Sequence, residues 1–382
     1  MYRIISEENI DINKTMTFYD TILTIDWDKI GEEICNKTSA DVETALHKDK
    51  LDLEDLKALV SPAAESYLET MAKLSQEATQ KRFGKTIQFY IPLYLSNECL
   101  NHCIYCGFNH NNDIHRIVLT DEQIMNEVQV IKEMGFEHVL LLTGESPRHA
   151  GIDYIEHAVQ LVKNHFKQVS LEVQPLSTED YQRLRTAGLY GVYIYQETYN
   201  QKRYTHYHPA GMKNDYRWRV ETPDRLGQAG VHKIGLGALL GLEDWRVESI
   251  YLAMHLRYLE KHYWKSKYSI SFPRMRPHEG DFQPGYDVTD KQFAQMIWAF
   301  RIFDNDIEMS LTTRESKAFR DNMVSLGITS MSAGSKTEPG GYTSNEELEQ
   351  FSVNDNRSPK EMLEMIAQKG YEVVWKDWNN FD

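Results

Sequence analysis

The sequence predicts an α/β fold, a (β/α)8 TIM-type barrel with an N-terminal helical extension and a C-terminal extension packed on the barrel. The first observation is a strict alternation of β-rich runs with helical patterns, which is typical of a parallel sheet. The second is size, because eight such units fill residues 86–335 and a barrel of this type takes about 250 residues. A doubly wound open sheet shows the same alternation, so the sequence leaves closure of the barrel open.

The predicted strands are short runs rich in β-branched and aromatic residues. They cover residues 86–96, 138–145, 168–175, 191–198, 233–240, 268–277, 308–313 and 328–335. Between them, apolar residues at helical spacing predict helices. These cover residues 120–136, 153–166, 178–187, 215–228, 245–264, 290–303 and 315–326.

Capping signals fix the starts of several predicted helices. Thr120 and Thr289 are each followed three residues later by glutamine, which is the pattern of a capping box. Residues 27–80 are predicted to be helical, with Ser39 as a helix cap, and 358–369 form one more helix with Pro359 in its first turn. The predicted parts are therefore residues 1–80 as the N-terminal helical extension, 81–337 as the barrel and 338–382 as the C-terminal extension.

Composition narrows the function. The chain has 382 residues, with 42 basic and 57 acidic side chains and a net charge of −15, so it is a poor match for nucleic acid. No run approaches the eighteen apolar residues of a membrane span. The first residues lack the apolar stretch of a secretory signal. We therefore expect a cytoplasmic protein that binds neither nucleic acid nor a membrane.

Three of the four cysteines, Cys99, Cys103 and Cys106, lie in one C-x3-C-x2-C loop after the first predicted strand. Three thiolates on a short loop can hold three corners of a [4Fe-4S] cluster and leave the fourth iron open. Structural zinc with His102 or His110 as the fourth ligand is the alternative, although zinc ligands usually come in two separated pairs. The remaining cysteine, Cys35, is expected to be a small buried hydrophobic residue.

The cysteine loop resembles that of the radical S-adenosylmethionine (SAM) enzymes. The resemblance implies that SAM occupies the open iron and is cleaved to a 5′-deoxyadenosyl radical. Leu142-Thr143-Gly144-Glu145 is similar to the Gly-Gly-Glu element that receives the SAM amino group, with Thr143 in place of the first glycine. By the same resemblance the residues expected to contact SAM are Tyr105, Phe108, Glu145, Gln196, Glu197, Arg219, Gly237 and Leu239. Arg217 and Arg225 are neighbours that could be confused with Arg219.

From about Trp27 to Trp378 the sequence resembles the 2-iminoacetate synthase (tyrosine lyase) family, in segments such as PLYLSNECLNHCIYCGF, KIGLGALLGL and SKTEPGGY. The resemblance implies cleavage of the Cα–Cβ bond of L-tyrosine to 2-iminoacetate (dehydroglycine) and p-cresol, for the thiazole ring of thiamine. It places Arg314 at the substrate carboxylate, and Tyr94 and Thr312 near the amino group. The partner of the phenol stays open among Arg276, His278 and Glu279.

The related tyrosine lyases that build the [FeFe]-hydrogenase cofactor carry additional C-terminal cysteines, whereas this chain has none after Cys106. Release of 2-iminoacetate is therefore the expected outcome. Two other hypotheses stay open: a non-catalytic zinc or iron–sulfur scaffold, and a radical SAM lyase of another amino acid such as tryptophan. The resemblance also implies two protein partners, a thiazole synthase and a flavodoxin or ferredoxin that donates the electron.

Overall fold

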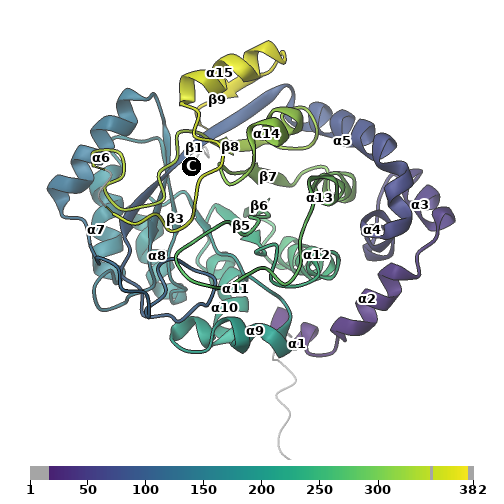
Figure 1. Ribbon diagram of the computed structural model, residues 1–382, viewed down its shortest axis with the longest axis horizontal. Helices are drawn as coiled ribbons and strands as arrows, with labels where there is room; N and C mark the ends of the chain where they lie inside the picture. The colour runs from purple at the N-terminus through teal and green to yellow at the C-terminus, as the bar shows by residue number, and fades with distance from the viewer. Residues whose placement is uncertain (1–16, 345–346, 377–382) are drawn as a thin grey trace, which may run out of the picture.

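The computed structural model describes residues 17–344 and 347–376, and within them eight parallel strands close into a barrel (Figure 1). Strand β1 pairs in parallel with both β8 and β2, which joins the two ends of the sheet. The predicted barrel is therefore confirmed and the open sheet is excluded. The strands are β1 (Thr86–Ser96), β2 (His138–Thr143), β3 (Gln168–Glu172), β4 (Gly191–Tyr193), β5 (Lys233–Gly237), β6 (Lys267–Ser271), β7 (Glu308–Leu311) and β8 (Ser330–Ser332).

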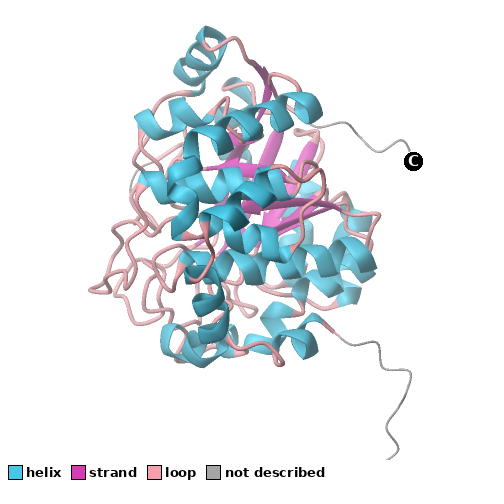
Figure 2. Cartoon of the chain, turned by 90° about the vertical axis from the view of Figure 1, so that its right-hand side faces the viewer, coloured by secondary structure: helices cyan, strands magenta, loops and turns pink. Residues whose placement is uncertain are grey.

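Helices surround the strands, and the long loops gather on one side of the barrel (Figure 2). Thr120 and Thr289 close the predicted capping boxes of α6 and α13. None of the helices in the described part of the chain is long and apolar enough to cross a membrane. The helices that alternate with the strands are α6 (Asp121–Glu133), α7 (Ile152–Val162), α8 (Thr178–Ala187), α9 (Gln201–Tyr207), α10 (Tyr216–Val220), α11 (Thr222–Gln228), α12 (Trp245–His262), α13 (Asp290–Phe303) and α14 (Lys317–Met323).

Several expectations were wrong in detail. The single helix expected over 215–228 is split into α10 and α11, because Pro223 stands in the first turn of the second helix. Ser39 is the first residue of α3, and its neighbour Thr38 provides the cap. Cys35 ends α2 with an exposed side chain, so it is not part of the core.

The C-terminal part adds α15 (Pro359–Gln368), with Pro359 at its start as expected, and β9 (Glu372–Val374). Strand β9 was not predicted, because three residues carry too little pattern to be recognised. It pairs in parallel with Thr86–Gln88 at the start of β1 and so extends the sheet beyond the barrel. Residues 1–16, expected to lack a secretory signal, and the last residues of the predicted C-terminal extension lie outside the described residues.

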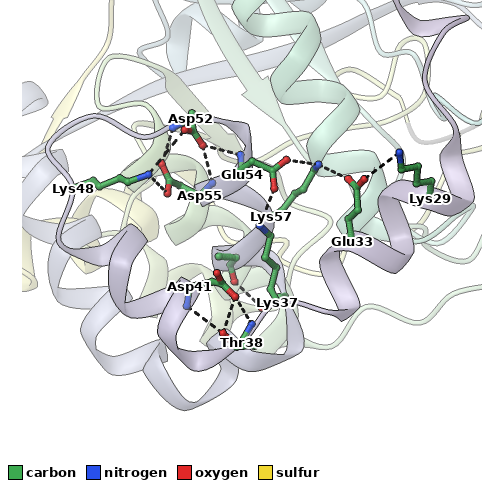
Figure 3. Close-up of polar contacts among 12 residues, drawn as sticks. Lys29, Glu33, Lys37, Thr38, Asp41, Lys48, Asp52, Glu54, Asp55 and Lys57 are labelled. Carbon is green, nitrogen blue, oxygen red and sulfur yellow. Dashed lines mark hydrogen bonds and ion pairs between the residues drawn. The ribbon is translucent and has the colours of Figure 1, made fainter.

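The N-terminal helices pack against α12 and α13 on the outside of the barrel (Figure 1). Ion pairs link them to one another, as Figure 3 shows. The buried ammonium of Lys57 contacts the carboxylates of Glu33 and Glu54 at 2.5 and 2.6 Å, and Lys48 contacts Asp55 at 2.6 Å. These helices are α1 (Phe18–Ile22), α2 (Trp27–Cys35), α3 (Ser39–Leu46), α4 (Leu53–Val60), the 3-10 helix η1 (Pro62–Tyr67) and α5 (Leu68–Phe83).

The inside of the barrel is partly polar. Side chains of a strand alternate between its two faces, so the fully buried Ile87, Phe89, Ile91 and Leu93 of β1 face the helices. The opposite face points inward, where the Tyr90 hydroxyl hydrogen-bonds with Ser310 at 3.0 Å. Other inward pairs join Gln88 to Gln168 and Lys233 to Glu308. Branched apolar residues usually fill this space, whereas here polar side chains stand beside Leu140 and Leu142, which suits a ligand with both polar and apolar parts.

The Lys233–Glu308 pair gives a test of this interior. Glu308→Leu leaves the ammonium of Lys233 buried without its carboxylate, and removing one partner of a buried pair costs about 3–5 kcal/mol. We expect a loss of this order in the free energy of unfolding, measured in urea. The double variant Lys233→Met/Glu308→Leu removes both charges and should recover most of the loss. A double variant no more stable than the single one would contradict this account of the pair.

Candidate active site

The cysteine loop leaves β1 at its carboxyl end and is folded by its own polar side chains. The Asn97 side chain accepts a hydrogen bond from the backbone N–H of Ile117 at 2.7 Å. The guanidinium of Arg116 donates to the carbonyl oxygens of Asn97 and Phe108 at 2.8 and 3.0 Å. These hydrogen bonds connect the two ends of the loop to each other and to Phe108 in its middle. The cysteines are thereby held at the mouth of the barrel.

Cys99, Cys103 and Cys106 line one cavity. Burial raises the pKa of the Cys99 thiol to about 11 and the pKa of Cys103 well above its usual value. A buried thiolate needs a cation beside it, so the three thiols suit a metal-containing ligand. No three His, Cys, Asp or Glu side chains in the described residues are grouped closely enough for a single metal ion. A cubane cluster does not require such a group, because each thiolate binds a different iron.

The two histidines considered as a fourth zinc ligand do not line the cavity of the cysteines. Their rings contact each other instead, with centroids 5.1 Å apart. Nδ1 of His110 hydrogen-bonds with the carbonyl oxygen of Cys99 at 3.2 Å. The residues around the cysteines thus fit an iron–sulfur cluster with one open iron better than a zinc site with His102 or His110.

A buried ionic network lies beside the cysteines. The carboxylate of Glu145 accepts hydrogen bonds from Arg219 at 2.8 Å and from the Asn101 side chain at 2.7 Å. Lys213, in the 3-10 helix η2 (Met212–Asn214), donates to Glu197 at 2.7 Å. Arg219 also lies 3.6 Å from the Glu197 carboxylate. The network joins the cysteine loop, β2, β4 and α10 at a single point.

The charges of this network keep one another ionised. Although burial is the largest influence on Glu145, the cations of Arg219 and Lys213 hold the pKa of its carboxyl below the usual value. Burial is likewise the largest influence on Lys213, yet the surrounding carboxylates and thiols raise its pKa. Two anions and two cations, all with little exposed surface, thereby balance one another.

The two residues after β4 that were expected to contact SAM, Gln196 and Glu197, differ in whether they line the cavity. Glu197 has φ 67°, the only positive value among the described non-glycine residues, and its side chain lines the cavity. The preceding Gln196 is buried but lines neither the cavity of the cysteines nor its extension into the barrel.

Gly237, at the end of β5, does not line the cavity either. A Cβ there would lie 2.6 Å from the ring of Tyr195, so the glycine makes room for that tyrosine. Tyr105, Phe108, Glu145, Arg219 and Leu239 all line the cavity.

The neighbouring arginines are distinguished from Arg219 by their surroundings. Arg217 is exposed and pairs with Glu221 at 3.1 Å. Arg225 stacks on the ring of Trp218 at 3.5 Å and lines no part of the cavity. Only Arg219 of the three faces the buried carboxylates.

A second part of the cavity extends from the cysteines into the barrel and contains Tyr94, Thr312 and Arg314. The guanidinium of Arg314 lies 3.3 Å from the ring centroid of Phe351, and no carboxylate pairs with it among the described residues. Its neighbour Glu315 instead pairs with Arg274 and Arg276. Burial lowers the pKa of Arg314. The guanidinium donates one hydrogen bond, to the carbonyl oxygen of Arg274 at 3.4 Å. A half-buried arginine without a carboxylate partner is a ready receptor for a carboxylate.

Arg276 is the one of the three expected phenol partners that lines the cavity, and its guanidinium already pairs with Glu315 at 2.9 Å. His278 and Glu279 lie outside the cavity lining. These placements favour a polar group of the barrel interior over this loop as the surroundings of a bound phenol.

The structure also brings in residues that were not expected from the sequence. The Tyr94 hydroxyl donates to Gln350 at 2.8 Å, and the amide of Gln350 contacts the sulfur of Cys106 at 3.6 Å. Gln350 and Phe351 belong to an irregular segment that no periodic pattern marks. Glu172 and Tyr195, by contrast, stand at the inward positions of strand ends and could have been found from that alternation.

Comparisons with known proteins agree with this geometry. Residues 93–254 match the radical SAM superfamily, and residues 271–372 match the biotin and thiamin synthesis associated domain. The chain is 49% identical to 2-iminoacetate synthase of Escherichia coli over 96% of this chain and 97% of that protein. The same enzyme of Salmonella typhimurium is 48% identical over the same shares. The crystal structure of HydG, a maturase of the [FeFe]-hydrogenase, superposes with a TM-score of 0.87 at 32% identity, over 91% of this chain and 80% of that one.

Gly144 tests how tightly the cysteine loop is seated. A Cβ at this position would lie 2.2 Å from the carbonyl oxygen of Glu98, directly before Cys99, so Gly144→Ala must displace the loop. Such overpacking costs about 1–3 kcal/mol. We expect less iron and sulfide per chain after anaerobic loading than in the wild type. Gly31→Ala, whose Cβ would meet only Val247 at 3.6 Å, is the control and should load normally. Equal loading of both variants would disprove the close seating of the loop.

Proposed function

The chain belongs to the 2-iminoacetate synthase family of radical SAM enzymes, and we propose that the cavity at the mouth of its barrel is the active site. The protein is a carbon–carbon lyase that cleaves L-tyrosine between Cα and Cβ to 2-iminoacetate and p-cresol. The 2-iminoacetate is used to build the thiazole ring of thiamine. One observation supports this location above all: the part of the cavity lined by the three cysteines and the part lined by Arg314 share eight residues. A cofactor on the cysteines and a carboxylate on Arg314 are thus neighbours.

In this proposal Cys99, Cys103 and Cys106 would hold a [4Fe-4S] cluster with one iron free for SAM. The bound groups would supply a 5′-deoxyadenosyl radical to the substrate. The residues assigned to SAM are those that line the cavity: Tyr105, Phe108, Glu145, Glu197, Arg219 and Leu239. Gln196 and Gly237 lie behind this lining and support it, the glycine by admitting the ring of Tyr195.

Arg314 receives the substrate carboxylate, and Tyr94 and Thr312 flank the reactive end of the amino acid. The side chain of tyrosine then extends into the barrel, where the lining offers hydroxyl groups from Tyr90, Ser271 and Ser332. Such a polar lining suits a phenol better than an indole with its single donor. Enclosure by the barrel holds the reacting atoms together and excludes water.

Two protein partners belong to the proposal. A thiazole synthase that takes 2-iminoacetate directly protects it from hydrolysis, and a flavodoxin or ferredoxin supplies the electron. With a net charge of −15, the chain attracts an acidic donor only through a local basic surface, so the association should weaken with salt. The unpaired cysteines agree with a reducing compartment, and we place the enzyme in the cytoplasm.

The proposal is tested by anaerobic reconstitution with iron and sulfide, followed by SAM, a strong reductant and L-tyrosine. We expect 5′-deoxyadenosine and p-cresol to form together. L-Tryptophan in place of tyrosine should give no cleavage product. An intact cluster that yields neither product from tyrosine would refute the proposed function.

The cysteine assignment has its own control within the chain. Cys103→Ala removes one buried cysteine of the cavity and should abolish SAM cleavage that depends on the cluster. Cys35→Ala changes an exposed cysteine at the end of α2 and should retain both the absorbance of the cluster and the activity. Activity that survives in the first variant, or disappears in the second, contradicts the assignment.

Arg314→Lys keeps the positive charge but loses the planar pair of donors that matches a carboxylate. A hydrogen bond to a charged group contributes about 1.5–3 kcal/mol, so we expect KM for tyrosine to rise roughly 10- to 100-fold. Part of the SAM should then be cleaved without p-cresol, because the substrate is held loosely. Arg217→Lys, at an exposed arginine outside the cavity, is the matched control. An unchanged KM in the Arg314 variant would show that another group holds the carboxylate.

A further inference from the structure

Glu172 stands where the two parts of the cavity meet. It is the last residue of β3, paired in register with Leu142 of β2. Its side chain lines both the part with the three cysteines and the part with Arg314. Its carboxylate therefore borders both the region assigned to SAM and the region assigned to the substrate.

The carboxylate of Glu172 has no partner of its own. The other two acidic residues of the cysteine part are committed, Glu145 to Arg219 and Glu197 to Lys213. Within the described residues, no hydrogen bond or ion pair joins the carboxylate of Glu172 to any side chain or backbone group, and the ladder with β2 uses only its backbone. A carboxylate that is largely withdrawn from water and unpaired is costly, so its placement calls for a ligand.

The cavity therefore presents one unpaired cation, Arg314, and one unpaired anion, Glu172. This is the charge pattern of a zwitterionic amino acid, with a carboxylate at one side of Cα and an ammonium group at the other. The remaining charges that act on Glu172 are those of Glu197, Lys213 and Arg219. These three side chains belong to the balanced network around Glu145, so their charges are already neutralised by one another and are not free to bind the substrate.

We propose that Glu172 binds the α-ammonium group of the substrate and accepts one of its protons. The inference rests on the proposed function and assigns a residue to a step in it. One N–H bond breaks and its electron pair stays on nitrogen, while an O–H bond forms on the carboxylate. An ammonium and a carboxylate become a neutral amine and a neutral acid, and a water-poor cavity favours the neutral pair. The neutral amine is the form from which a hydrogen atom can then be taken.

The electrostatics of the site agree with this step. Burial is the main influence that raises the pKa of Glu172 to about 7, and the repulsion of Glu197 adds to it. The cations of Arg314, Lys213 and Arg219 act in the opposite direction. The tyrosines that share the cavity wall, Tyr94 and Tyr195, have pKa values raised by burial and stay neutral. Efficient proton transfer requires a group that titrates near the working pH.

Glu172→Gln tests the inference because glutamine keeps the size of the side chain but cannot accept the proton. Affinities are measured by calorimetry on the anaerobically reconstituted enzyme with SAM. The ligands are L-tyrosine and 3-(4-hydroxyphenyl)propionate, which lacks only the amino group. We expect the variant to bind tyrosine at least about tenfold more weakly and to bind the analogue as the wild type does.

The pH profile of p-cresol formation gives a second readout. In the wild type, activity should fall below about pH 7 as Glu172 becomes protonated. In the variant the neutral amine must come from solution, so the residual activity should rise about tenfold per pH unit towards the pKa of the free ammonium group. A merely structural role would lower the activity without changing this profile.

Glu248→Gln is the matched control, since Glu248 is also a glutamate whose pKa burial raises, here to about 8, but it is hydrogen-bonded to Thr198 and Tyr199 outside the cavity. It should leave the preference for tyrosine over the analogue unchanged. The inference is overturned if Glu172→Gln weakens both ligands equally, weakens SAM binding in the absence of tyrosine, or changes nothing. Absence of p-cresol from the wild type would instead refute the proposed function, and the binding comparison can still be read in that case.

Discussion

The buried ion pair between Glu145 and Arg219 is the contact on which the site depends. Through Glu145 it fixes the end of β2, and through Arg219 it fixes α10 and the carbonyl oxygen of Tyr195. Asn101, two residues after the first cysteine, donates to the same carboxylate and accepts the backbone N–H of Lys213. The cysteine loop is therefore positioned by its contacts with this charged network.

This network also explains why the cavity can discriminate. Charges that neutralise one another at short range exert little attraction on a substrate that does not contact them, because their fields largely cancel. Glu145, Glu197, Lys213 and Arg219 cancel in this way, and Glu315 is likewise paired with two arginines. What remains to select the substrate is Arg314 and Glu172 with the hydroxyl groups of the barrel interior. Selectivity thus follows from which charges are left without partners.

The parts of the fold that could be predicted from the sequence are those with a regular local pattern of residues. Every barrel strand and the capped starts of α6 and α13 follow from alternation and capping, which act over a few neighbouring residues. The cysteine loop follows from spacing along the chain. By contrast, β9 and the contact of Gln350 with Tyr94 join residues hundreds of positions apart through segments without a repeating pattern. Gln196 and Glu197 show the limit most clearly, since one residue of register decides which of the two faces the cavity.

The C-terminal segment is best understood as a wall of the active site. This irregular segment is held in place by Asp355, whose carboxylate pairs with the fully buried Arg320 of α14 and with Arg357. Upstream of this anchor, the carbonyl oxygen of Gln350 comes so close to Gly107 that a Cβ there would lie 2.6 Å away, directly beside Cys106. The Tyr342 hydroxyl bonds to the carbonyl of Pro92 in β1. These contacts place Gln350 and Phe351 in the lining of the cavity, beside the cysteines and Arg314. The C-terminal extension follows the barrel in the sequence, but the walls of the site come from both.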